Sequence, residues 1–155
     1  MPDFDVIVIG AGHAGIEASL SCARMGCRTL MLTINEDTIG HLSCNPAIGG
    51  VGKGQLVKEV DALGGEMGKA ADACAIQFRI LNASKGPAVQ SSRAQIDRRL
   101  YKAYMTKTCR GQRGLAVREA QVAALIVRDG ACAEVRTAAG EEITCSALVV
   151  ASGTF

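Results

Sequence analysis

The segment Asp5–Ala18 constrains the fold most, because it joins an apolar strand to a glycine-rich turn and then to a helix. The run Val6–Ile9 is β-branched throughout, which is typical of a buried parallel strand. The turn reads Gly10-x-Gly12-x-x-Gly15. In such a turn the first glycine permits a sharp bend, the second lets the backbone approach a pyrophosphate, and the third lets the helix pack closely on the strand. The pattern predicts an α/β, Rossmann-like domain that binds a dinucleotide at the start of the helix.

The second strand of this unit is expected over Arg28–Thr33, after a helix stop at Gly26. In Rossmann units an acidic residue about 20 positions after the glycines binds the ribose hydroxyls. Here the nearest carboxylate, Glu36, is expected past the tip of the strand, in the loop. We therefore expect the hydroxyl of Thr33 or the amide of Asn35 to serve instead.

Composition places the chain among globular proteins and narrows its chemistry. Of its 155 residues 48% are apolar and 21% are charged, which is enough for one domain with a sizeable core. Only 3% are aromatic, so recognition of bases on an aromatic platform is not expected, and the net charge of +2 neither requires nor excludes a nucleic acid. Seven cysteines without a CxxC pair or a zinc-like spacing predict free thiols and no metal site. No basic leader and no apolar run of about 18 residues is present, so we expect no membrane segment and a cytoplasmic location.

The middle of the chain is expected to alternate loops with regular elements. Residues Asn35–Gly54 are rich in glycine and predict an ordered, ligand-facing loop. A helix is expected over Gln55–Leu63, a strand over Ala75–Leu81, a turn over Asn82–Pro87 and a basic helix over Ser92–Cys109.

The last stretch reads as all-β. The runs Gln121–Arg128 and Ala131–Thr137 flank Asp129-Gly130, which predicts a β-hairpin with a type I′ turn. A further strand is expected around Ile143–Cys145, followed by a buried strand at Ala147–Ala151.

The loop Ser43–Gly54 (SCNPAIGGVGKG) holds the candidate thiol. It is not a phosphate-binding Walker motif, because it lacks both the first glycine and the hydroxyl residue after Lys53. Cys44 lies in this glycine- and proline-rich loop, near Lys53 and His41 in sequence, where positive charge favours a thiolate. The alternative for Cys44 is a small buried residue, and that is the reading we adopt for the other six cysteines.

Two basic features have alternative readings. From residue 93 to residue 113 there are seven Lys or Arg against one Asp. On a helix, Arg98, Arg99 and Lys102 form one basic stripe, which suits either a phosphate backbone or a solvated face. His13 lies inside the glycine turn, as a solvent-facing residue or as a contact to phosphate or flavin, and its position alone does not make it catalytic.

Four segments together resemble one known family: GAGHAGIEA, SCNPAIGGVGKG, VDALGGEMGKAAD and IQFRILNASKGPAVQSSRAQIDRRLY. On these segments the chain is similar, over residues 4–155, to the N-terminal part of the bacterial tRNA uridine 5-carboxymethylaminomethyl modification enzymes, the MnmG (GidA) family. The folate-dependent tRNA uracil methyltransferases are related but lack this long cysteine-loop string.

The resemblance implies an FAD-binding domain of the two-dinucleotide-binding type, in an enzyme that works with the GTPase MnmE. This enzyme adds an aminomethyl or carboxymethylaminomethyl group at C5 of the tRNA wobble uridine, with methylenetetrahydrofolate, glycine or ammonia, and NADH, and a homodimer is implied. Cys44 matches a family cysteine proposed to act at the uridine, and the backbone of Val122 is implied to meet adenine. The residues implied to hold the FAD pyrophosphate are Gly10, Ala11, Gly12, His13, Ala14 and Gly15.

The chain differs from the family pattern at its far end. In the family, Gly153-Thr154-Phe155 is followed by a nicotinamide-binding insertion, the rest of the FAD domain and a helical partner- and tRNA-binding region. We therefore expect residues 1–155 to be a truncated, N-terminal part of an FAD-binding domain that is inactive alone. A non-catalytic flavin-binding remnant and a different FAD or NAD oxidoreductase remain as alternatives.

Overall fold

A computed structural model describes residues 1–128 and 130–153, and for residues 131–133 it describes only the backbone. The chain divides into two compact units, Met1–Gly40 with the segment from Thr106 onward, and His41–Met105. Several positions discussed above lie outside the described residues, namely Asp129 of the expected turn, the side chain of Cys132, Thr154 and Phe155.

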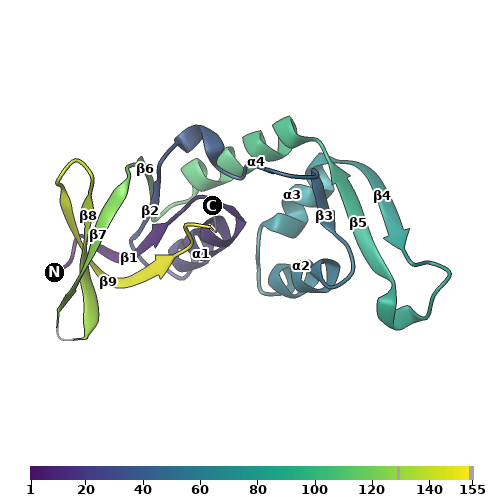
Figure 1. Ribbon diagram of the computed structural model, residues 1–155, viewed down its shortest axis with the longest axis horizontal. Coiled ribbons are helices and arrows are strands. Elements are labelled where there is room, and N and C mark those ends of the chain that lie inside the picture. The colour runs from purple at the N-terminus through teal and green to yellow at the C-terminus, as the bar shows by residue number, and fades with distance from the viewer. Residues whose placement is uncertain (129, 154–155) are drawn as a thin grey trace. The chain divides into compact units, whose positions relative to one another are not determined.

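The first unit is built on a six-stranded sheet of order β6-β2-β1-β9-β8-β7 (Figure 1). Its elements are β1 (Phe4–Ile9), α1 (His13–Arg24), β2 (Thr29–Thr33), a 3-10 turn η1 (Glu36–Thr38), β6 (Leu115–Glu119), β7 (Val122–Arg128), β8 (Ala131–Thr137) and β9 (Glu142–Val150). Strands β6, β2, β1 and β9 are parallel, and β7, β8 and β9 form an antiparallel meander. Helix α1 packs on β1, β2, β6 and β9. The predicted Rossmann-like α/β fold with a hairpin near its end is confirmed.

The core of this unit explains its apolar strands. Ile7, Leu30, Leu32, Val135 and Ile143 form one buried cluster, with exposed fractions of 2% or less. Every residue of β2 is buried, as expected for a parallel strand that is covered on both faces. Burial of each such aliphatic side chain contributes about 1.5–3 kcal/mol, so this cluster fixes the strands that carry the glycine turn.

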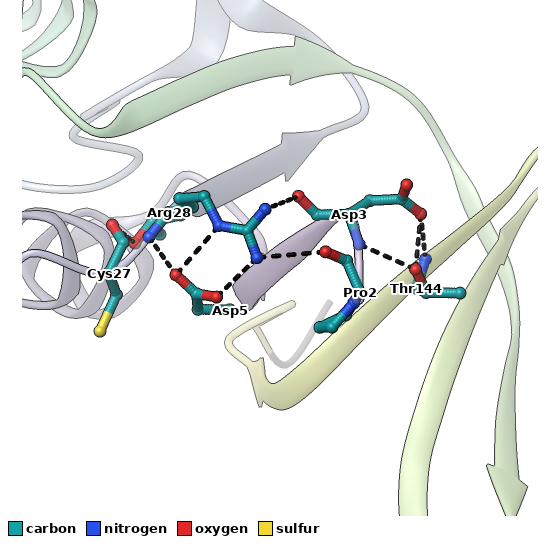
Figure 2. Close-up of polar contacts among 7 residues, drawn as sticks. Pro2, Asp3, Asp5, Cys27, Arg28 and Thr144 are labelled. Atoms are coloured by element: carbon teal, nitrogen blue, oxygen red, sulfur yellow. Dashed lines mark hydrogen bonds and ion pairs between the residues drawn. The ribbon is translucent and has the colours of Figure 1, made fainter.

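Polar side chains tie the beginning of β1 to the residue before β2 and to β9 (Figure 2). The Asp5 carboxylate accepts hydrogen bonds from the Arg28 backbone N–H at 2.7 Å and from its guanidinium at 2.8 Å. On the other side, the Asp3 carboxylate accepts from the Thr144 backbone N–H at 2.9 Å and from its hydroxyl at 2.6 Å. These hydrogen bonds lower the pKa of both carboxyls below the ordinary value.

The second unit holds a three-stranded antiparallel sheet of order β3-β5-β4. Its elements are β3 (Ala47–Gly49), α2 (Lys53–Ala62), α3 (Met67–Cys74), β4 (Ala75–Leu81), a 3-10 turn η2 (Pro87–Val89) and β5 (Ser91–Ile96). Helix α4 (Arg98–Gly111) begins in this unit and ends in the first. The predicted strand over Ala75–Leu81 is confirmed, and the predicted helix over Gln55–Leu63 begins two residues earlier.

Two predictions about the middle of the chain are wrong in part. The expected loop Asn35–Gly54 contains η1, β3 and the beginning of α2. The expected helix Ser92–Cys109 is a strand followed by a helix. Residues 93–96 alternate between half-buried and buried positions, the period of a strand. The helix starts only after Asp97, whose carboxylate accepts from the backbone N–H groups of residues 99 and 100 at 2.8 and 3.0 Å.

The end of the chain also differs from expectation. The two strands predicted at Ile143–Cys145 and Ala147–Ala151 are one continuous strand, β9. The second of these segments was expected to be buried, but Val150 is 58% exposed. Here β8 pairs only with residues 142–144, so among the described strands residues 145–150 pair with β1 alone and form an edge of the sheet.

Candidate functional site

The glycine turn connects β1 to α1, and its three glycines have different surroundings. Gly10 has a φ of +108°, and a Cβ there would lie 2.2 Å from the carbonyl oxygen of Ala151. A Cβ on Gly15 would lie 1.9 Å from the carbonyl oxygen of Gly10. A Cβ on Gly12 would meet no atom within 4 Å. Gly10 and Gly15 are therefore required by packing, whereas Gly12 leaves open space beside the turn.

This open space lies at the N-terminus of α1. Gly12 is the N-cap, it provides no side-chain cap, and the first turn carries no acidic residue. The N–H groups at a helix start lack intrahelical acceptors, and the helix dipole makes this end positive. Ala11 is buried and its carbonyl accepts from Gly40 N–H at 3.1 Å, which fixes the turn, while His13 is half-buried and Ala14 is exposed. This arrangement fits a pyrophosphate, because it offers free donors, positive potential and space at one point.

The tip of β2 lies at the same edge of the sheet, since Gly10 N–H donates to the carbonyl of Leu32 at 2.8 Å. The Thr33 hydroxyl donates to the Asn35 carbonyl at 3.2 Å, and the Asn35 side chain accepts from Asp37 N–H at 2.7 Å. Thr33 and Asn35, the two residues predicted to contact the ribose, therefore also stabilise the turn that follows β2. The predicted position of Glu36, past the strand tip, is confirmed.

The start of β7 is tied to this edge as well. Ala120 N–H donates to the carbonyl of Thr33 at 2.8 Å, so the residues that follow β6 stay beside the end of β2. Val122 comes two residues later, is half-buried and packs against the core of the first unit. The glycine turn, the tip of β2 and Val122 thus belong to one unit. The turn, the β2 tip and the residues that lead from β6 to Val122 lie at the carboxyl ends of parallel strands, where nucleotides bind in such folds. Strand β6, which brings these residues to the edge, was not predicted from the sequence.

Cys44 belongs to the second unit and is exposed, so the alternative of a small buried residue is wrong for it. The Arg98 guanidinium donates to the Cys44 carbonyl, and Ile96 N–H donates to the carbonyl of Pro46 at 2.7 Å. The cysteine loop is thereby attached to the end of β5 and the start of α4. The ammonium of Lys53 donates to the carbonyl of Ala47 at 3.4 Å and so contacts the backbone of the loop.

The other described cysteines are less suited to reaction. Cys74, Cys109 and Cys145 are buried as predicted, and Cys22 and Cys27 are half-buried. Burial raises the pKa of the Cys22 and Cys74 thiols, which disfavours their thiolates at neutral pH. Cys44 is therefore the one described cysteine whose side chain is exposed.

The part of the chain that the structure describes contains neither a metal-binding cluster nor a membrane-spanning helix. There, no group of three or more His, Cys, Asp or Glu side chains is placed to hold a metal ion. Within the same residues, no helix is both long enough and apolar enough to cross a membrane.

Comparison with known proteins identifies relatives over nearly the whole chain. Residues 5–155 match the family described as glucose inhibited division protein A. The tRNA uridine 5-carboxymethylaminomethyl modification enzyme MnmG of Aquifex aeolicus is 55% identical over 153 residues, which are 99% of this chain and 25% of that enzyme. The MnmG of Desulfotalea psychrophila is 57% identical over 155 residues, which are 100% of this chain and 24% of the relative. The chain thus spans about a quarter of the length of these curated relatives.

Solved structures agree with this relationship. Aquifex aeolicus GidA, in its form II crystal, matches with a TM-score of 0.96 and 55% identity, over 99% of this chain and 26% of that one. PqsL of Pseudomonas aeruginosa, described as a probable FAD-dependent monooxygenase, matches with a TM-score of 0.63 over 94% of this chain and 41% of its own. At 15% identity this second likeness concerns the fold alone. The chain belongs to the glucose inhibited division protein A family, whose curated members similar to it are MnmG tRNA uridine modification enzymes.

Proposed function

We propose that this chain is the FAD-binding portion of an enzyme that, together with the GTPase MnmE, adds an aminomethyl or carboxymethylaminomethyl group at C5 of the tRNA wobble uridine. In this proposal residues 1–155 are the N-terminal part of an FAD-binding domain, and they are inactive without the further segments that relatives four times as long contain. The one-carbon donor is methylenetetrahydrofolate, the reductant is NADH, and the complete enzyme is a cytoplasmic homodimer.

The observation that carries the proposal is the open space at Gly12, beside the uncapped start of α1. In a chain more than half identical to MnmG enzymes, this space suits the pyrophosphate of FAD. The turn from Gly10 to Gly15 holds the pyrophosphate, with the backbone N–H groups that follow Gly10 as donors, since the Gly10 N–H is bonded to Leu32. The backbone of Val122 meets the adenine. Bound FAD supplies a redox centre that accepts or donates hydride.

Cys44 is proposed to act on the uracil ring as a nucleophile. Its thiolate forms a bond to C6, and the electron pair of the C5–C6 double bond moves to C5, which becomes nucleophilic. After C5 has gained its substituent, loss of the C5 proton and cleavage of the S–C6 bond restore the ring. The exposure of Cys44 and the anchoring of its loop by Arg98 support this role, because a nucleophile must be accessible and held in place.

Flavin titration and an assay of modified tRNA nucleosides test the proposal separately. The chain is expected to bind FAD weakly, because the relatives supply the rest of the flavin domain from segments beyond those matched here. In an enzyme completed with the remaining segments of a relative, Cys44→Ser is expected to abolish wobble modification and to leave bound FAD unchanged. Modification that persists in this variant would remove Cys44 from the mechanism, whereas no FAD binding by either protein would overturn the cofactor assignment.

A further inference from the structure

One face of the sheet in the second unit carries four long polar side chains. Gln77 and Arg79 lie on β4, and Arg93 and Gln95 lie on β5. The register pairs Arg79 with Arg93 and Gln77 with Gln95, so the two arginines are direct neighbours and so are the two glutamines. We call these four residues the arginine–glutamine face.

This face is hollow and is not covered by the helices of its own unit. A cavity of about 280 Å³ is lined by the four residues and Leu81. The neighbouring strand β3 contributes only Ala47 and Gly49 on this side, because these small residues pair with Gln95 and Arg93. Helices α2 and α3 lie over the opposite face, where they line a separate cavity with Ala94 and Phe78.

Over the residues that the structure describes, no carboxylate compensates the charges on this face. Directly opposite side chains on antiparallel strands have Cβ atoms about 4.5–5.5 Å apart, and like charges at such positions destabilise a sheet. Among the described residues, neither Arg79 nor Arg93 forms an ion pair or a side-chain hydrogen bond. Other arginines of the chain do pair with carboxylates, namely Arg28, Arg110, Arg118, Arg128 and Arg136.

We propose that the arginine–glutamine face binds a phosphodiester group of the RNA substrate; this inference rests on the function proposed above. Each planar guanidinium can donate two parallel hydrogen bonds to phosphate oxygens, and a phosphodiester presents two non-bridging oxygens to two adjacent guanidinium groups. The flanking carboxamides suit the base edges and ribose hydroxyls that accompany a phosphate in RNA. A simple carboxylate would satisfy the arginines and leave the glutamines without a matching partner.

The position of the face in the fold links it to the candidate nucleophile. Strand β3 begins three residues after Cys44, and its first residue, Ala47, pairs with Gln95. The glutamine end of the face and the cysteine loop therefore lie at the same end of one small sheet. A nucleotide strand bound along the face would lead from the arginines toward Cys44.

RNA binding by charge-matched variants tests this assignment. Binding of a fluorescein-labelled anticodon stem-loop RNA is measured by fluorescence anisotropy at several salt concentrations. The double variant Arg79→Gln/Arg93→Gln is expected to bind about tenfold or more weakly, since hydrogen bonds to charged groups are lost. The slope of log K against log salt should fall by roughly 0.7–1.4, the value for one or two phosphates of a single strand.

The control Arg99→Gln/Lys102→Gln removes the same charge from the basic stripe on α4. Affinity close to that of the unmodified chain in this control supports the proposal, whereas an equal or greater loss than in the sheet variant overturns it. Arg79→Lys/Arg93→Lys keeps the charge and loses the paired donors, so it should restore the salt slope while affinity remains several-fold reduced. Circular dichroism confirms that each variant is folded.

Two further measurements separate the possible outcomes. A hexaglutamate peptide that displaces the RNA at equal concentration would show a carboxylate site and overturn the phosphodiester assignment. RNA affinity that is absent in the unmodified chain, or unchanged in the Arg79→Gln/Arg93→Gln variant, would also overturn it. Flavin titration of the same variants reports on the glycine turn, so a failure of the FAD assignment would be seen independently of the RNA result.

Discussion

Substitution of alanine at two glycines of the turn between β1 and α1 should separate packing from ligand binding. At Gly15 the new Cβ would lie 1.9 Å from the carbonyl oxygen of Gly10 and 2.8 Å from its carbon. Contacts below 3.0 Å are essentially never seen for real Cβ atoms, so the backbone of the turn must move by about 1.1 Å (3.0 minus 1.9). Overpacking of this kind costs about 1–3 kcal/mol, and the better helix propensity of alanine offsets about 0.5–1 kcal/mol of it. Because the atoms met are backbone atoms, the upper half of the overpacking range applies, and about 2–3 kcal/mol less about 0.5–1 kcal/mol leaves a net loss of about 1–2.5 kcal/mol. This corresponds to a fall in Tm of roughly 2–10 °C for a chain of this size.

Gly12→Ala is the matched control for stability and the test for binding. Its Cβ would enter open space, and its φ of −74° suits any residue, so the Tm should change by less than that of Gly15→Ala. The same Cβ would occupy the space proposed for the pyrophosphate, and FAD affinity should fall about tenfold or more. Thermal unfolding followed by circular dichroism and flavin titration by fluorescence measure the two effects. An unchanged Tm for Gly15→Ala would refute the packing argument, and unchanged FAD affinity for Gly12→Ala would refute the ligand argument.

Three further predictions concern pH, thiol reactivity and activity. Hydrogen bonds from Arg28 hold the pKa of the Asp5 carboxyl below its ordinary value of 3.8, so its contribution to stability is complete above that value and is lost as the pH falls through the lowered pKa. Asp5→Asn should therefore lower the Tm at neutral pH and flatten its decline below about pH 4, and an identical pH profile would contradict this. Iodoacetamide should alkylate the exposed Cys44 before the buried Cys74, whose pKa is raised by burial, and equal rates in peptide mass spectra would contradict this. Incubation of tRNA with this chain, FAD, MnmE, GTP, NADH, the folate donor and glycine or ammonium should give no modified wobble uridine, and detectable product in digested nucleosides would show that the chain is active alone.

The sequence predicted best those features that depend on local rules. The glycine turn, the strand Ala75–Leu81 and the hairpin around Gly130 were recognisable because turn chemistry and residue periodicity act over a few positions. The Gly12 space follows from the same local pattern, since the φ angles and helix start are set by the turn itself. The family resemblance is confirmed by the match over residues 5–155.

The missed elements depend on contacts between distant residues. Strand β6 pairs with β2, which lies far earlier in the chain, and its sequence LAVRE shows little local signal. The sequence analysis predicted β5 and α4 as a single helix, because basic residues continue from one into the other. Only the N-cap at Asp97 marks the boundary between them. The arginine–glutamine face could not be foreseen either, since it requires the register that places Arg79 opposite Arg93.

The pairing of β1 with both β2 and β9 has a consequence for biosynthesis. Val6 pairs with Thr29, 23 positions later, but Phe4 pairs with Cys145, 141 positions later. At translation rates of about 5–20 residues per second, roughly 7–28 s separate the synthesis of these two partners. During that interval one edge of β1 is without its strand, and unpaired apolar edges are the parts of a nascent chain that aggregate. The strand that leads into the glycine turn therefore has both edges paired only after a partner 141 positions later in the chain has been made.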